Sequence, residues 1–255
     1  MPWNPVIYNK FKNIRFLPFF DLSDMIQEAP LMKSVDLGCG TGEQTALLVE
    51  KFKQATFIGI DSSEEMLEQA EHLKSDRLDF KRQTIEKFVE SNESWDLVFS
   101  NAALQWADNH KDLFPKLIDK LNPGGQFVVQ MPYQPENILN KLLYTLAESE
   151  PYRTQFKGWN RPSSVLLLDD YAQIMFDGGL SQLNISQRIY PLIAQDHHTL
   201  YEFIAGSALI PYLERLEEKE KALFIEAFKV EIANTFKKLP ALYAFKRILL
   251  YGKKE

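Results

Sequence analysis

Residues 34–45 read SVDLGCGTGEQT, and this stretch decides the fold. An apolar run ends at Leu37 and is followed by three glycines at alternate positions, 38, 40 and 42. A helical pattern comes next, and its apolar face comprises Ala46, Leu47, Leu48 and Phe52. Glycine suits a backbone that turns at positive φ or approaches a ligand closely, and a helix N-terminus leaves N–H groups free. The stretch predicts a strand, a tight turn and a helix beside a ligand.

A dinucleotide site is the main alternative for this turn. That fingerprint reads G-x-G-x-x-G, whereas the spacing here is G-x-G-x-G and Asp36 precedes the first glycine. A carboxylate at that place disfavours a diphosphate and favours a cation such as a sulfonium or ammonium. An ordinary strand-to-helix turn with a capping polar residue is the second alternative.

The next predicted strand, 55–60, ends at Asp61, about 20 residues beyond the glycine turn. An acidic residue at that distance can reach ribose hydroxyls at the end of the second strand. Ser62 or Ser63 would cap the following helix, which carries Met66. One carboxylate for a cation and one for a ribose indicate a nucleoside that carries a positive charge.

With these motifs, the sequence resembles the S-adenosylmethionine-dependent methyltransferases of the Rossmann-like class. VDLGCGTG at 35–42 is similar to that family's first motif and GIDSSEEML at 59–67 to its second. WNPVIYNKF at 3–11, SNAALQW at 100–106 and LFPKLIDKLNPGGQFVVQMP at 113–132 resemble, more narrowly, the trans-aconitate 2-methyltransferase family. The resemblance implies an α/β fold: a Rossmann-like, seven-stranded, mostly parallel sheet in the order 3-2-1-4-5-7-6, with helices on both faces. It also implies S-adenosyl-L-methionine as the cofactor.

Ligands of such sheets bind outside the carboxyl ends of the strands. We therefore expect the strand ends and the segments that follow them to contact the cofactor through Asp36, Gly38, Gly40, Asp61, Ser62, Met66, Thr84, Ile85 and Asn101. Tyr8 and Arg15, in the N-terminal segment 1–16, are expected to contact the cofactor as well. Thr84 stands where the resembling family usually has an aspartate for the adenine amino group. Its hydroxyl and the backbone around Ile85 would then recognise the adenine.

The domain organisation follows from where the alternation of strands and helices is interrupted. We expect the cofactor-binding core to comprise 1–132, 166–190 and 241–255, with 1–16 as an N-terminal lid. Insertions at 133–165 and 191–240 are predicted to form a helical cap. Pro18 is expected to open a helix, and a single helix is predicted at about 198–214.

Methyl transfer from a sulfonium needs positioning and removal of water more than a catalytic group. No residue is assigned a certain catalytic role; Tyr8, Gln105 and Trp106 are expected to position the reactants. His110 is the histidine nearest to this region in the sequence, with a site role or a solvated helix start as the alternatives. The expected substrate contacts are Trp3, Trp106, Tyr133, Trp159, Arg161 and Ile210. No metal-ligand spacing occurs.

A carboxylate acceptor needs no general base, unlike an alcohol or amine, so a small organic acid is favoured. Ile210 stands where the resembling family typically has an arginine, which favours an acid with an apolar part over a tricarboxylate. Methylation of another oxygen, nitrogen or carbon centre, or of an acyl-carrier-bound acid, stays open. So does a nucleoside-binding regulatory protein without turnover.

Composition limits the partners. A net charge of −6 argues against nucleic acid. The single cysteine, Cys39, excludes an intrachain disulfide. The sequence shows no run of about 18 apolar residues and no basic segment followed by an apolar one, so we expect neither a membrane span nor a signal peptide. We expect a soluble cytoplasmic protein, monomeric or dimeric, that does not bind membranes.

Overall fold

The computed structural model describes residues 11–255. Trp3, Tyr8 and the first ten residues of the expected lid lie outside this range. The chain divides into two compact units. The sheet unit comprises Pro18–Pro132, Ser164–Arg188 and Arg247–Glu255. The described part of the helical unit comprises 11–17, Tyr133–Ser163 and Ile189–Lys246. The domain boundaries expected from the sequence stay a prediction.

One seven-stranded sheet has the order β3-β2-β1-β4-β5-β7-β6, so the predicted fold class and strand order are confirmed. Its strands are β1 (Lys33–Leu37), β2 (Thr56–Asp61), β3 (Leu78–Arg82), β4 (Trp95–Asn101), β5 (Leu121–Pro132), β6 (Leu180–Ala194) and β7 (Ala241–Lys254). The pairs among β1 to β5 are parallel, and β7 runs antiparallel to β5. The parallel strands therefore place their carboxyl ends along one edge.

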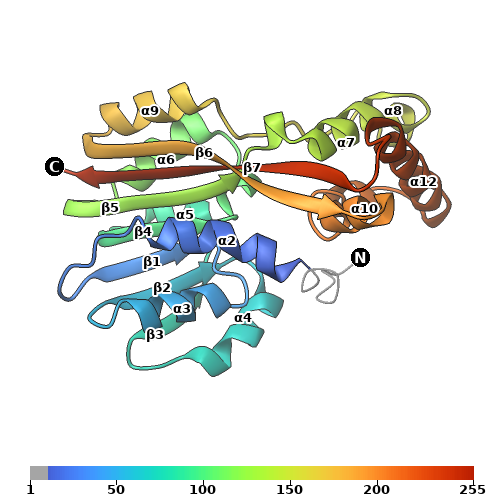
Figure 1. Cartoon of the computed structure of the whole chain (residues 1–255). Coiled ribbons are helices and arrows are strands. Elements are labelled where there is room, and N and C mark those ends of the chain that lie inside the picture. The colour runs from blue at the N-terminus through green and yellow to red at the C-terminus, as the bar shows by residue number, and fades with distance from the viewer. Residues whose placement is uncertain (1–10) are drawn as a thin grey trace. The chain divides into compact units, whose positions relative to one another are not determined.

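Helices cover both faces of this sheet (Figure 1). One face carries α2 (Lys12–Ser23), α3 (Glu43–Lys51) and α4 (Glu64–Ala70), and the other carries α5 (Ile85–Glu90), α6 (His110–Ile118) and α9 (Leu168–Asp177). On the first face Phe19 meets Phe99 edge-on, and on the second Phe114 meets Phe127. The apolar residues of the strands thus have a buried layer on either side, as expected for a parallel sheet.

Pro18 lies inside α2 and does not open it. A proline in a helix interior removes one backbone hydrogen bond. Burial of Phe19 and Leu22 in the last turns of the same helix compensates for that loss. The prediction for this helix start is therefore wrong by about six residues.

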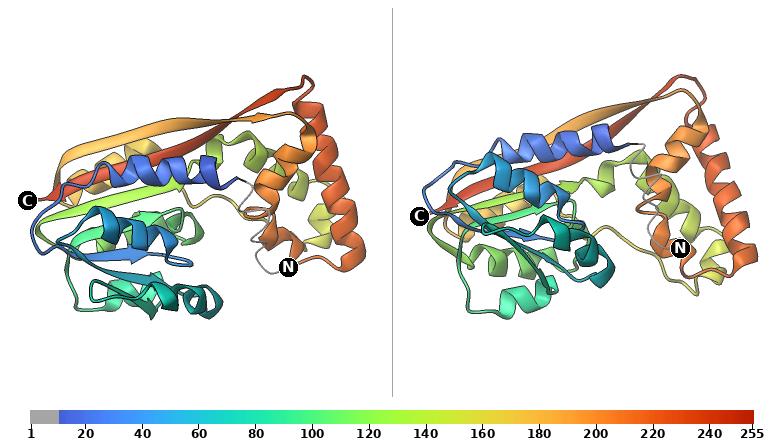
Figure 2. Two further views of the ribbon diagram at one scale, coloured as in Figure 1. Left: turned by 60° about the horizontal axis from the view of Figure 1, so that its bottom comes forward. Right: turned by 90° about the horizontal axis from the view of Figure 1, so that it is seen from below.

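The helical unit is built around buried aromatic rings. Its helices are α7 (Ile138–Glu148), α8 (Tyr152–Gln155), α10 (His197–Ala205), α11 (Ile210–Leu213) and α12 (Glu218–Thr235). Phe224 and Phe228 of α12 are fully buried, and α10 lies beside α12 in both views of Figure 2. The single helix predicted at 198–214 is two helices, because Gly206 ends α10 and Pro211 takes a first-turn position of α11.

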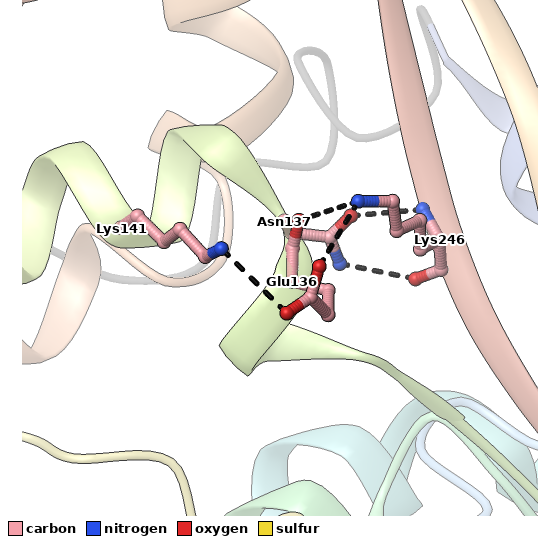
Figure 3. Close-up of polar contacts among 4 residues, drawn as sticks. All are labelled: Glu136, Asn137, Lys141 and Lys246. Carbon is pink, nitrogen blue, oxygen red and sulfur yellow. Dashed lines mark hydrogen bonds and ion pairs between the residues drawn. The ribbon is translucent and has the colours of Figure 1, made fainter.

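Asn137, which precedes α7, joins this helix to β7 within the helical unit. Its side chain donates to the Lys246 carbonyl at 3.0 Å and accepts from the Lys246 N–H at 2.8 Å (Figure 3). The Lys246 ammonium donates to the Glu136 carbonyl at 2.9 Å. Asn137 is fully buried, so its side chain replaces the backbone pairing that ends where the chain leaves β5.

Candidate active site

The glycine turn between β1 and α3 has the backbone that its sequence predicts. Gly38, Gly40 and Gly42 all adopt positive φ, at 74°, 57° and 73°. A Cβ on Gly38 would lie 2.2 Å from the Cβ of Ala103, so no other residue fits there. The N–H groups of Gly38 and Cys39 donate to the Ile60 carbonyl. Burial raises the pKa of the Cys39 thiol, which therefore stays protonated and packs as a small apolar group.

Asp61 joins the glycine turn to the next helix. Its Oδ2 accepts the Gly40 N–H at 2.9 Å, and its Oδ1 accepts the Ser63 N–H at 2.9 Å. Ser63, not Ser62, caps α4, because its hydroxyl accepts the Met66 N–H at 3.3 Å. Each carboxylate oxygen retains a further lone pair. The carboxylate is thus fixed at the strand end with capacity for a ligand's hydroxyls.

Asp36 is almost fully buried behind the turn. Its Oδ2 accepts the Thr45 hydroxyl at 2.6 Å. Burial raises the pKa of the Asp36 carboxyl to about 7, with a smaller rise from the Asp61 carboxylate and an opposing effect of the Thr45 hydroxyl. A cation placed beside Asp36 would lower this pKa. The ionisation of this carboxyl near neutral pH is therefore sensitive to a bound charge.

The exit of β4 lies against the glycine turn. The Asn101 amide donates to Oε1 of Gln44 in α3 at 2.8 Å. Its Oδ1 is buried, and within residues 11–255 no group bonds to it. The next residue, Ala102, has a φ of 57°, a strained value for a residue with a side chain. An acceptor atom without a donor within 11–255 and a strained backbone thus coincide at this exit, where Asn101 is expected to contact the cofactor, and this role stays a prediction.

The turn η2 (Leu104–Trp106) follows, and His110 supports it from behind. Nε2 of His110 donates to the Leu104 carbonyl at 2.9 Å. Nδ1 of the neutral ring therefore accepts the Tyr171 hydroxyl at 2.5 Å. Burial lowers the pKa of His110, which keeps the ring neutral. The expected solvated helix start is wrong for His110, which is 1% exposed.

Gln105 and Trp106 stand on this turn in opposite environments. Gln105 is buried and donates to the Ala102 carbonyl at 2.6 Å, whereas Trp106 is 40% exposed. At the neighbouring strand end, Thr84 caps α5 by accepting the Lys87 N–H at 3.3 Å, and Ile85 is the first residue of that helix. The roles expected for these side chains toward cofactor and substrate stay predictions.

The other expected site residues lie in the helical unit. The Arg15 guanidinium donates to the Phe203 carbonyl at 2.6 Å. The Tyr133 N–H donates to the Lys246 carbonyl, and the Arg161 N–H donates to Asn160 Oδ1. Trp159 packs against Tyr212, and Ile210 begins α11. Their parts in cofactor or substrate binding stay predictions.

Several partners of these residues escaped the sequence analysis. Gln44 orients Asn101, Thr45 bonds to Asp36, and Tyr171 bonds to His110. Gln44 and Thr45 sit in the first turn of α3 and so point back at the strand ends, which the sequence could have indicated. Tyr171 is far from His110 in the sequence, and no local pattern indicates their contact. The same holds for Arg215, whose guanidinium carbon lies 3.7 Å from the centre of the Trp159 ring.

Within 11–255, no helix combines the length and apolar character needed to cross a membrane. The same residues bring no three His, Cys, Asp or Glu side chains together as ligands for a metal ion.

Comparisons with known proteins agree with this geometry. A family model described as "Methyltransferase domain" matches residues 28–195. A trans-aconitate 2-methyltransferase from Deinococcus radiodurans is 37% identical over 98% of this chain and 97% of its own length. A second, from Rhizobium etli, is 30% identical over the full length of both chains.

Solved structures show the same fold at low sequence identity. The YcgJ protein from Bacillus subtilis matches 94% of this chain and 98% of its own with a TM-score of 0.61 and 18% identity. A putative sarcosine dimethylglycine methyltransferase from Galdieria sulphuraria matches 96% and 86% with a TM-score of 0.58 and 15% identity. The chain therefore belongs to the methyltransferase-domain family and is an S-adenosylmethionine-dependent methyltransferase with a Rossmann-like fold.

Proposed function

We propose that this enzyme transfers the methyl group of S-adenosylmethionine to a carboxylate of a small organic acid. The observation that carries the proposal is the 37% identity, over almost the whole chain, to a protein named trans-aconitate 2-methyltransferase. When bound, the cofactor supplies an electrophilic methyl on a sulfonium, and the acid supplies the attacking oxygen.

The residues at the carboxyl edge of the sheet fit such a cofactor. The Asp61 carboxylate is oriented by two backbone N–H groups and can accept ribose hydroxyls. A Cβ on Gly40 would meet no atom of residues 11–255 within 4 Å, so a ligand can approach the backbone there. Asn101 Oδ1 is an acceptor in need of a donor, and an ammonium is one. Asp36 would stabilise the positive charge from behind the turn.

The side chains near this edge favour an acceptor that is already ionised. Both ring nitrogens of His110 are engaged with Leu104 and Tyr171, so this histidine has no free nitrogen for an acceptor's proton. Asn101 and Gln105 are neutral amides, which do not act as bases at neutral pH. A carboxylate needs no proton removal, and these residues need only orient it and exclude water.

Within the class of acids, we propose that compounds with one or two carboxylates and an apolar part are preferred over trans-aconitate. Ile210 begins α11, whose four residues, Ile210–Leu213, include no charged side chain. An arginine expected at position 210 would add a charge-assisted hydrogen bond, which contributes about 1.5–3 kcal/mol to binding.

A methyl-transfer assay over a panel of acids, amines and alcohols tests the proposal. We expect methyl esters of acids with an apolar part, and Ile210→Arg should shift preference toward trans-aconitate roughly tenfold. Preference of the native enzyme for trans-aconitate would contradict the narrower acceptor class, and methylation of amines or alcohols alone would contradict the acid acceptor. Binding of S-adenosylmethionine without turnover on any of these compounds would favour a regulatory nucleoside-binding role.

A further inference from the structure

Gln130 in β5 carries a side-chain amide that no group of residues 11–255 satisfies. The residue is fully buried. Neither its nitrogen nor its oxygen has a hydrogen-bond partner anywhere in the described chain, 11–255. Buried polar side chains nearly always have partners, because an unpaired amide out of water destabilises the fold. Because the unpaired amide lowers the stability of the folded chain, we expect it to have a partner outside these residues, such as a bound ligand.

The position of Gln130 places it at the ligand-facing edge. It is in register with Asn101 of β4, and its carbonyl accepts the Ala102 N–H at 2.9 Å. Paired residues of neighbouring strands direct their side chains to the same face of a sheet. Asn101 Oδ1 and, on the following turn η2, Gln105 Oε1 are also buried and lack a partner within 11–255. Two adjacent strands therefore offer unsatisfied polar atoms at the same level, next to the strained Ala102.

We infer that Gln130 binds the carboxylate of the methyl acceptor, while Asn101 Oδ1 receives a donor from the cofactor beside it. The two amides differ in what they can offer. The Asn101 nitrogen already donates to Gln44, and its oxygen is the unpaired atom, whereas the Gln130 nitrogen donates to no described group and keeps both N–H donors. A carboxylate only accepts hydrogen bonds, so it matches Gln130, and an ammonium only donates, so it matches Asn101.

This inference rests on the proposed acid acceptor and adds a residue that would orient it. The amide of Gln130 is already removed from water. Its hydrogen bonds to an acid would therefore form in a surrounding of low dielectric constant, where they are stronger than at an exposed site. The folded enzyme without substrate bears the cost of the unpaired amide, and the bound acid removes it.

The variant Gln130→Met separates this role from a structural one. Methionine has a similar length and no polar group. If the amide serves only the substrate, its removal should raise the melting temperature by about 2–4 °C or more. The same variant should lower kcat/KM for 3-phenylpropionate and trans-aconitate by about ten- to a hundredfold. Its affinity for S-adenosylmethionine should change little.

Ser34→Ala is the matched control. The Ser34 hydroxyl is also fully buried and also lacks a partner among residues 11–255, but it lies at the opposite, amino-terminal edge of β1. This variant should leave or raise the melting temperature and leave turnover unchanged.

Three results would overturn the inference. A lower melting temperature of Gln130→Met would show that the amide supports the fold. If Gln130→Met melts at a higher temperature and methylates the acids as fast as the native enzyme, the amide is unpaired but does not bind the substrate. Both outcomes leave acid methylation by the native enzyme intact, so they contradict Gln130 alone. A native enzyme that methylates amines or alcohols and no acid would contradict the proposed function and the carboxylate at Gln130 together.

Discussion

The sheet unit and the helical unit are each stabilised from within by a different kind of contact. At the carboxyl edge of the sheet unit, backbone N–H groups of Gly38, Cys39 and Gly40 bond to the end of β2. In the helical unit, rings pack on rings: Phe224 lies 5.0 Å from Tyr152 and 5.2 Å from Phe156 between centroids. The first arrangement depends on backbone geometry and tolerates few residues, whereas the second depends on filled volume and tolerates many combinations of apolar residues.

Loss of a central ring should produce the largest change. Phe224→Ala should lower the free energy of unfolding by about 3–5 kcal/mol, because a fully buried ring leaves a cavity. Leu223→Ala, whose side chain is 61% exposed, is the neighbouring control and should cost no more than about 0.5 kcal/mol. Denaturant unfolding measures both. Equal losses in the two variants would show that the rings do not form the core of the helical unit.

A methyl group on the glycine turn should have the next largest effect. Gly38→Ala combines a positive φ with a clash against Ala103 and should cost about 2–4 kcal/mol and abolish binding of S-adenosylmethionine. Gly179→Ala is matched in φ, at 74°, but its Cβ would meet no described atom within 4 Å. It should cost about 1 kcal/mol through φ alone, with cofactor affinity kept. Calorimetric titration of both variants with S-adenosylmethionine distinguishes the effect of the clash from that of the backbone strain. Equal affinities of the two variants would show that the turn does not bind the cofactor.

The hydrogen bonds of Tyr171 that hold His110 behind η2 should contribute less to stability, but measurably. Tyr171→Phe deprives His110 Nδ1 of its donor and the Leu166 N–H of its acceptor, and should cost about 1–3 kcal/mol of stability. Turnover should fall while cofactor affinity holds, because η2 carries Gln105 and Trp106. Tyr251→Phe is the control, since the Tyr251 hydroxyl is buried without a partner in 11–255. Thermal melts that show the same loss in both variants would contradict a specific role of the Tyr171 hydroxyl.

The pH dependence of cofactor binding should be the smallest effect. A carboxyl with a pKa of about 7 is half protonated at neutral pH, and a bound cation favours its ionised form. As the pH rises towards 7, the affinity for S-adenosylmethionine should therefore increase by up to about tenfold per pH unit, and it should level off above pH 7. In the free enzyme the sign is opposite: the folded state retains a proton that the unfolded state releases, so this stabilising contribution is lost as pH rises from about 4 to 7.

Asp36→Asn removes the titrating group and serves as the control for that series. Its affinity should be weaker at pH 8 and nearly independent of pH. Calorimetry over this range that shows an unchanged slope in Asp36→Asn would assign the pH dependence to another group.

The same contrast explains what could be predicted from the sequence. The glycine turn and the place of Asp61 follow motifs whose residues are dictated by backbone geometry, and these predictions agree with the fold. The strand order was implied by the resemblance to the methyltransferase family, and the fold confirms it. His110 was misplaced because its partners, Tyr171 and the Leu104 carbonyl, come together only in the folded chain. The ring cluster around Phe224 and the stacking of Arg215 on Trp159 join distant segments, and no spacing in the sequence indicates them. The unpaired amide of Gln130 is equally invisible, because an apolar strand sequence does not reveal which of its polar atoms lack partners.

The most direct test follows the transferred methyl group. The enzyme is incubated with S-adenosylmethionine labelled in its methyl group and with 3-phenylpropionate or trans-aconitate, and the product is then hydrolysed with alkali. An ester releases its methyl as methanol, whereas a methyl on carbon or nitrogen stays on the acceptor. The account predicts label in methanol, in amounts equal to the S-adenosylhomocysteine formed. Label that stays on an acceptor after hydrolysis, or S-adenosylhomocysteine formed only with amines or alcohols, would contradict it.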